Sequence, residues 1–98
     1  MIAVIFEVEM KDGMTETYFD LAGELKPELE KIDGFISVER FESTATPGKF
    51  VSLSYWTGED AVKAWRDHAG HKVVQDRGKA EIFKGFRIRV AEVIRDYT

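Results

Sequence analysis

The chain contains no cysteine among its 98 residues. This absence excludes disulfide bonds, a thiol nucleophile and a thiolate metal site. The chain suits a reducing compartment as well as any other, and the cytoplasm is the default expectation. A basic start and a long apolar run are also missing, since Glu7 follows the first apolar residues directly. We therefore expect neither a signal peptide nor a membrane as partner.

The chain also lacks the motifs of several enzyme classes. It has no glycine pattern of the P-loop or dinucleotide-binding kind and no Gly-x-Ser-x-Gly elbow. With 14 Lys and Arg against 18 Asp and Glu, the net charge is −4. The cations are interspersed with acids and do not form the basic face of nucleic-acid binders. Nucleotide cofactors with such motifs, nucleophilic hydrolysis and nucleic acid as a partner are therefore not expected.

The length predicts one domain over residues 1–98, near the size at which a single core is only just sufficient. Alternation and helical spacing of the apolar residues predict its secondary structure. The expected elements are, in order, a strand at 2–10, a helix at 15–32, strands at 35–43 and 49–56, a helix beginning at Thr57, a shorter helix at 71–80 and a strand at 83–94.

Turn and cap residues support these boundaries. Gly34 suits the left-handed position that follows a helix, and the Pro-Gly pair at 47–48 suits the centre of a type II turn. Thr57 and Asp60 have the spacing of a capping box. Pro27 lies inside the first helix, where we expect a kink rather than a break.

The order βαββαβ is that of the ferredoxin-like α+β fold, with a four-stranded antiparallel sheet and both helices on one face. In a sheet with one solvent-exposed face, only every second residue of a strand is apolar. The first strand has apolar residues on both sides, with Ala3 and Ile5 on one side and Val4, Phe6 and Val8 on the other. We expect a second copy to cover the other face, which predicts a homodimer through the open sheet face.

The candidate catalytic residues lie on and after the second helix. On an ideal helix Trp65 belongs to the inward stripe, His68 lies about 60° from it, and His71 lies about 120° away. A helix break at Gly70 would return His71 to the sheet side and place it in the first turn of a new helix. The helix dipole there favours a neutral imidazole, which makes His71 a candidate general base.

Aromatic side chains around this helix predict a cleft between helices and sheet that suits a flat aromatic ligand. The expected substrate-binding residues are Tyr55, Trp56, His68 and Phe83. Arg87 and Arg89 share one parity of the last strand, so at least one pairs with an acid or holds an anionic ligand. No metal site is expected, because catalytic zinc needs three protein ligands and the His68-x-x-His71 pair has no third.

Three segments carry a family resemblance: residues 33–41 (DGFISVERF), residues 52–56 (SLSYW) and residues 59–66 (EDAVKAWR). With these segments the chain resembles the antibiotic biosynthesis monooxygenase domain family over essentially its whole length. The resemblance implies a dimeric α/β barrel of ferredoxin-like domains. It does not fix an activity, since one fold hosts several.

Two branches of that family are similar to this chain in different ways. The quinone-forming branch uses a helix tryptophan, matched by Trp65, a tyrosine where this chain has His71, and an arginine on the last strand, for which Arg87 is the nearest candidate. The haem-degrading branch also uses the tryptophan, with a strand asparagine and a proximal histidine; Glu7 and Gln75 stand in those neighbourhoods here.

The leading hypothesis is a cofactor-independent monooxygenase that acts on a small electron-rich aromatic or polyphenolic substrate. His71 would remove a proton, Arg87 would stabilise the anion, and Trp65 would stack on the ring. Haem binding with oxidative cleavage is the first alternative. A dimer that binds a small ligand without catalysis is the second.

Overall fold

The computed structural model describes all 98 residues, apart from the side chain of Ala69. Its elements are β1 (Ile2–Met10), α1 (Thr15–Glu30), β2 (Phe35–Glu42), β3 (Lys49–Trp56), α2 (Glu59–Arg66), α3 (Ala69–Arg77), the π-helical turn η1 (Gly78–Ile82) and β4 (Phe83–Glu92). The four strands form one antiparallel sheet in the order β2-β3-β1-β4. The predicted ferredoxin-like α+β fold is confirmed. No helix among the described residues is long and apolar enough to cross a membrane.

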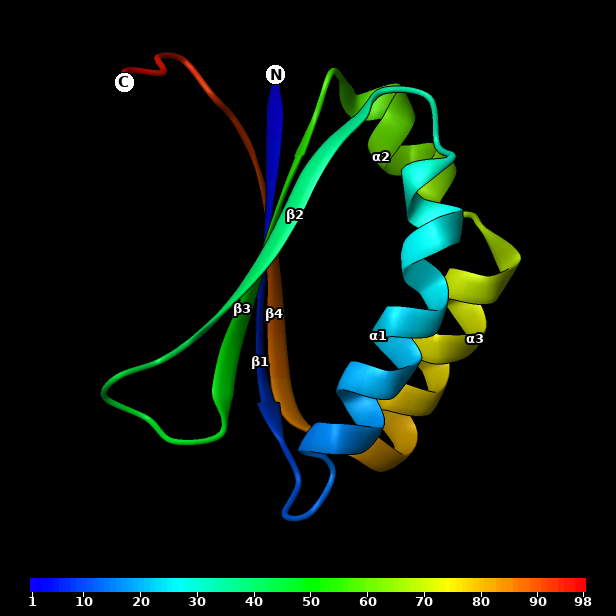
Figure 1. Ribbon diagram of the computed structural model, residues 1–98, viewed down its shortest axis with the longest axis vertical. Coiled ribbons are helices and arrows are strands. Elements are labelled where there is room, and N and C mark those ends of the chain that lie inside the picture. Colours follow the sequence, from blue (N-terminus) through cyan, green and yellow to red (C-terminus); the bar gives the residue numbers. More distant parts are fainter.

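The helices all lie on one side of the sheet (Figure 1). The even-numbered side chains of β1, such as Phe6 and Val8, face these helices and pack into the core. The odd-numbered side chains, such as Ile5, point to the opposite side, because side chains alternate along a strand. We call this second side the open face, since no helix lies over it in Figure 1. The predicted two-sided apolar pattern of β1 thus corresponds to one packed face and one uncovered face.

Two clusters of buried side chains make up the core between helices and sheet. One cluster consists of Val8, Met10, Tyr18, Phe50, Ile82 and Phe83, and the other of Leu29, Trp56 and Ala61. Trp56 is only 2% exposed, and its indole Nε1–H donates to the Ser54 hydroxyl over 2.9 Å. Trp65 and Val62 pack against the second cluster from α2. α2 therefore packs against strands β1 and β3 through this second cluster.

Several predicted boundaries shift. α1 ends at Glu30 rather than at residue 32, and β4 ends at Glu92 rather than at residue 94. The capping box is wrong: α2 begins at Glu59 after Gly58, with no side-chain cap, and the Thr57 backbone N–H instead donates to Gly34 O over 2.8 Å. The type II turn at 47–48 agrees with a φ of 80° at Gly48 and a 3.2 Å hydrogen bond from Lys49 N to Thr46 O.

The second helical region breaks earlier than predicted. α2 ends at Arg66, and His68 has an extended backbone with φ −64° and ψ 128°. α3 starts at the next residue, so Gly70 lies inside its first turn and does not break a helix. The predicted short helix at 71–80 is thus α3 followed by η1. His71 still lies in the first turn of a new helix, as predicted.

The fold constrains Gly34 tightly. Its φ is 92°, and an added Cβ would lie 2.8 Å from Ala61 Cβ and 2.6 Å from Thr57 Oγ1. Ala61 is buried in α2 and cannot move aside. Gly34→Ala is therefore expected to lower the free energy of unfolding by about 2–4 kcal/mol, measured by urea denaturation.

Gly13→Ala is the matched control for this prediction. Gly13 also has a positive φ, of 78°, but its added Cβ would meet nothing within 4 Å. That variant should lose only the backbone cost of about 1–2 kcal/mol. An equal loss of unfolding free energy in the two variants would show that the close approach of Gly34 to α2 leaves room for a Cβ atom.

Candidate active site

The junction between α2 and α3 brings three predicted site residues together. The extended backbone of His68 turns the chain between the two helices. The His71 ring then stacks on the Trp65 ring, with centroids 4.6 Å apart and an angle of 20° between the planes. The His68 ring lies against the same indole at 5.2 Å. One tryptophan therefore contacts both histidines of the chain.

A backbone hydrogen bond orients the His71 imidazole. Its Nδ1 lies 3.1 Å from the Trp65 carbonyl oxygen. A carbonyl only accepts, so Nδ1 carries the hydrogen in this bond. In the neutral ring the lone pair is then on Nε2, which is the atom that could accept a proton from a ligand.

Burial lowers the pKa of His71 below its ordinary value of 6.5. The hydrogen bond to the Trp65 carbonyl raises the pKa, and the nearby His68 lowers it, but burial is the largest cause. The imidazole is therefore neutral at pH 7. A neutral ring with a fixed tautomer is what a general base requires.

His68 holds the first turn of α3 in place. Its Nδ1 accepts the His71 backbone N–H over 3.4 Å, which makes His68 the N-cap. Its Nε2 lies 3.8 Å from a carboxylate oxygen of Glu28 on α1. A Cβ on Gly70 would lie 3.1 Å from the His68 ring, so the glycine lets this ring approach the helix closely. The role of Gly70 is therefore space rather than helix breaking.

An apolar strip on β4 lies on the same side of the sheet as the helices. It consists of Phe86, Ile88 and Val90, the cross-strand partners of Val8, Phe6 and Val4. These three side chains remain 42–50% exposed. Val4 packs against the same cluster as Trp65, so the Val90 end of the strip lies beside the Trp65 region. We call these three residues the β4 strip.

The other predicted site residues do not join Trp65 and His71. Trp56 and Phe83 are buried core residues rather than walls of a cleft. Tyr55 is the cross-strand partner of Ala3 and lies on the open face. Arg87 is the partner of Glu7 and lies on the open face too. Within one chain the sheet therefore separates Arg87 from His71.

Two arginines on the strands, Arg89 and Arg40, contact other side chains. Arg89 donates to Glu7 over 3.1 Å, which confirms the alternative that a strand acid pairs with one of the two β4 arginines. Arg40 faces the helices, with its guanidinium 5.8 Å from the centre of the Tyr18 ring. Its Nε is buried and has no hydrogen-bond partner among the described residues. Sequence reasoning missed Arg40, although its place two residues after Val38 gives it the apolar parity of β2.

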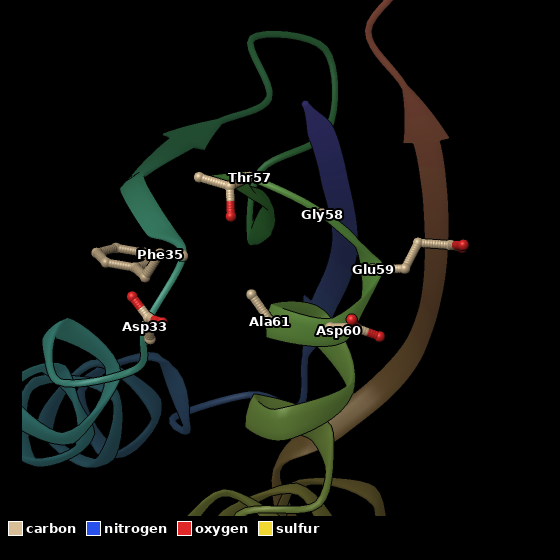
Figure 2. A pocket seen from close by; sticks show the side chains of 8 residues that line it. Asp33, Phe35, Thr57, Gly58, Glu59, Asp60 and Ala61 are labelled. Carbon is tan, nitrogen blue, oxygen red and sulfur yellow. The ribbon is translucent and has the colours of Figure 1, made fainter.

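A hollow lies away from this site. It has a volume of about 550 Å³ and is lined by Asp33, Gly34, Phe35 and residues 57–61. Figure 2 shows the Glu59 side chain pointing away from Thr57 and Ala61, which line the same hollow. The hollow contains no histidine, and the described residues include no group of three or more His, Cys, Asp or Glu arranged to hold a metal. We place the candidate site at the Trp65–His71 pair, because there a candidate base stacks on an aromatic surface.

Comparison with known proteins adds a family and two curated relatives. A family model described as antibiotic biosynthesis monooxygenase matches residues 1–77. Jasmonate monooxygenase ABM of Pyricularia oryzae is 39% identical over 93 residues, which cover 95% of this chain and 43% of that protein. Uncharacterized protein YqjZ of Bacillus subtilis is 32% identical over 62 residues, which cover 63% of this chain and 53% of that protein. The chain spans about half the length of these curated relatives.

Solved structures share the fold at lower identity. The Mycobacterium tuberculosis protein Rv0793 superposes with a TM-score of 0.86 and 14% identity, covering 99% of this chain and 98% of that chain. A likeness at this identity concerns the fold alone.

Proposed function

The chain belongs to the antibiotic biosynthesis monooxygenase family, and from this membership and its site we propose that it is a cofactor-independent monooxygenase for a small electron-rich aromatic substrate. His71 is the proposed general base. Trp65 is the proposed surface that holds the histidine and excludes water. The observation that carries this proposal is the stacked Trp65–His71 pair with its Nδ1 bound to a backbone carbonyl.

The proposed reaction begins with proton transfer from the substrate to His71 Nε2. The resulting carbanion-like anion reacts with O2. One oxygen atom stays on the attacked ring carbon as a quinone carbonyl, and the other leaves as water with the hydrogen of that carbon and the hydrogen of the phenol hydroxyl. The substrate itself supplies the electrons, so the protein provides deprotonation, positioning and a dry surface.

The β4 strip supports an apolar, flat substrate. Its half-exposed side chains offer hydrophobic contact on the side of the sheet that carries the base. Arg87 has no part in the proposed chemistry, because the sheet lies between it and His71. The proposal therefore does not include anion stabilisation by Arg87.

We also propose that the protein is a homodimer that pairs through the open face. Phe41 of β2 is a large, exposed apolar residue of this face, and Ile5 and Leu53 lie between the two edges of the same face. An apolar sheet face of this kind favours burial against a partner. A monomer mass in light scattering at micromolar concentration would contradict the homodimer.

The pH dependence of oxygen uptake tests the role of His71. A base works only when neutral, so kcat/KM should fall as the pH drops through the lowered pKa of His71, with a midpoint below 6.5. The rate should be constant from pH 7 upward until another group titrates. The measurement is oxygen consumption with a panel of dihydroxynaphthalenes and a metal chelator present. An acidic limb centred above 6.5 would contradict the assignment of the base.

Titration with haem separates the proposal from its main alternative. The proposed enzyme needs no haem, so oxygen uptake should be the same before and after haem is added. A saturable Soret shift that disappears in a His71→Ala variant, together with no oxygen uptake by the haem-free protein, would replace the proposal with haem binding.

A further inference from the structure

Arg40 of β2 lies on the helix side of the sheet, where the two core clusters form. It is half-buried, and its guanidinium lies 5.8 Å from the centre of the Tyr18 ring. Its Nε is buried without a hydrogen-bond partner, and no ion pair joins Arg40 to a carboxylate among the described residues. A buried charged donor without a partner is costly, so its presence here requires an explanation.

An acid on the same strand and side, Glu42, does not pair with Arg40. Glu42 lies two residues along β2, so its side chain leaves the strand on the same side. Its cross-strand partner is the core residue Phe50. Glu42 itself is exposed, and no ion pair joins it to Arg40. Pairing with Glu42 therefore does not explain the buried cation.

The row of residues that crosses the sheet from Arg40 changes from polar to apolar. The cross-strand partner of Arg40 is Ser52, followed by Phe6 on β1 and Ile88 of the β4 strip. Opposed residues have Cβ atoms about 4.5–5.5 Å apart, so the Ser52 hydroxyl lies beside the base of the Arg40 side chain. The guanidinium and the hydroxyl both donate, and a carboxylate only accepts. One end of this row is therefore suited to a carboxylate and the other to an apolar group.

This row adjoins the residues that pack with Trp65. The next row along the strands consists of Val38, Ser54, Val4 and Val90. Val38 and Val4 pack against the same core cluster as Trp65. Two residues along a strand span about 6.6 Å, so Arg40 is one such step from this row. Arg40 therefore lies on the side of the sheet that carries the proposed base, whereas Arg87 does not.

We propose that Arg40 and Ser52 bind the carboxylate of the substrate, which makes the substrate an aromatic acid. Two parallel N–H groups of a guanidinium fit the two oxygens of a carboxylate, and the Ser52 hydroxyl is a further donor. Ligand binding then supplies the partner that Arg40 lacks in the free protein. The identification of the ligand as a substrate rests on the proposed function, and the carboxylate site rests on Arg40 and Ser52.

Binding of two matched naphthalene derivatives tests the site without turnover. 2-Naphthoate carries the carboxylate, and 2-naphthalenemethanol has the same rings with a neutral hydroxymethyl group. Neither compound has a phenol hydroxyl for the proposed base to deprotonate. Calorimetric titration of the wild-type protein should give a Kd for 2-naphthoate at least about tenfold below that for the alcohol, the scale of charge-assisted hydrogen bonds.

Substitution of Arg40 assigns this preference to one side chain. Arg40→Gln should raise the Kd of 2-naphthoate by about tenfold or more and leave that of the alcohol unchanged. Arg40→Lys keeps the charge without the planar fork, so it should lose less affinity. Arg87→Gln is the matched control, because it removes the same charge on the open face, and it should bind both compounds as the wild type does. Circular dichroism checks that each variant is folded.

Glu42→Gln tests whether Arg40 serves only to balance the charge of Glu42. We expect this variant to bind 2-naphthoate at least as tightly as the wild type, because it removes a like charge on the same side of β2. Weaker binding in Glu42→Gln would show that Glu42 positions Arg40 or that the ligand lies elsewhere, and it would overturn the proposed site.

The remaining outcomes separate the carboxylate site from the proposed chemistry. Equal affinity of the wild type for the acid and the alcohol, or full affinity for 2-naphthoate in Arg40→Gln, would overturn the site. Arg40-dependent binding of 2-naphthoate, with no oxygen uptake from any dihydroxynaphthoate, would support the site and overturn the oxygenase. Oxygen uptake that is equal for dihydroxynaphthoates and dihydroxynaphthalenes, in the wild type and in Arg40→Gln, would do the reverse.

Discussion

Replacing His71 with alanine is expected to lower the rate of oxygen uptake by about 10²- to 10⁴-fold, the usual scale of general-base catalysis. The imidazole Nε2 is the proposed proton acceptor, and its neighbours Trp65 and His68 offer no equivalent group: the indole only donates, and the His68 Nδ1 lone pair accepts the His71 backbone N–H. Rates should be measured at pH 7, where His71 is neutral.

His71→Asn is the control that separates catalysis from structure. Its side-chain amide is able to donate to the Trp65 carbonyl, as Nδ1 of the histidine does, but it is not a base at pH 7. This variant should keep the wild-type melting temperature and still lose the activity. Full activity in either variant with a confirmed substrate would end the assignment.

Replacing Trp56 with alanine is expected to lower the free energy of unfolding by about 3–5 kcal/mol, the range for truncating a buried tryptophan. The side chain is 2% exposed and packs with Leu29 and Ala61, and its loss also removes the hydrogen bond to the buried Ser54 hydroxyl. Each kcal/mol corresponds to about 4–8 °C in a domain of this size. Calorimetry or thermal circular dichroism gives the shift.

Two further variants keep this prediction informative. Trp56→Phe retains most of the packing and measures a partial loss if the alanine variant does not fold. Trp65→Ala removes a partly exposed indole and should destabilise the fold less than Trp56→Ala while affecting activity more. A larger stability loss at Trp65 than at Trp56 would contradict the division between core and site.

The fold was predictable because its signals are local. The Pro-Gly pair at 47–48 determines its own turn, and Gly34 adopts the positive φ that its position after a helix suggests. The apolar residues at both parities of β1 predicted a sheet with two faces to cover, and the structure has helices over one face only. None of these inferences needs knowledge of a distant part of the chain.

The side of the sheet on which a residue lies was less predictable. Tyr55 and Trp56 are both aromatic and adjacent, so composition alone does not decide which one faces the helices. Cross-strand register decides it, and register placed Tyr55 and Arg87 on the open face. The β4 strip was missed because its apolar residues have the pattern of ordinary core positions, and only the structure shows that the helices leave them half exposed.

The convergence of Trp65 and His71 was predicted from helix geometry, but for a partly wrong reason. The turn occurs at His68 rather than at Gly70, because the His68 ring itself caps α3. Histidine is not among the preferred N-cap residues, so propensity gave no signal for it. The glycine matters instead because it leaves room for that ring.

The central claim is that His71 is a neutral imidazole with its hydrogen on Nδ1 and a free lone pair on Nε2. Nuclear magnetic resonance of the imidazole nitrogens in the wild-type protein tests it directly, and the His71→Asn variant assigns the signals, because only His68 remains in it. We expect the Nδ1–H tautomer and a pKa of His71 below 6.5. An Nε2–H tautomer, or a pKa above 6.5, would contradict it.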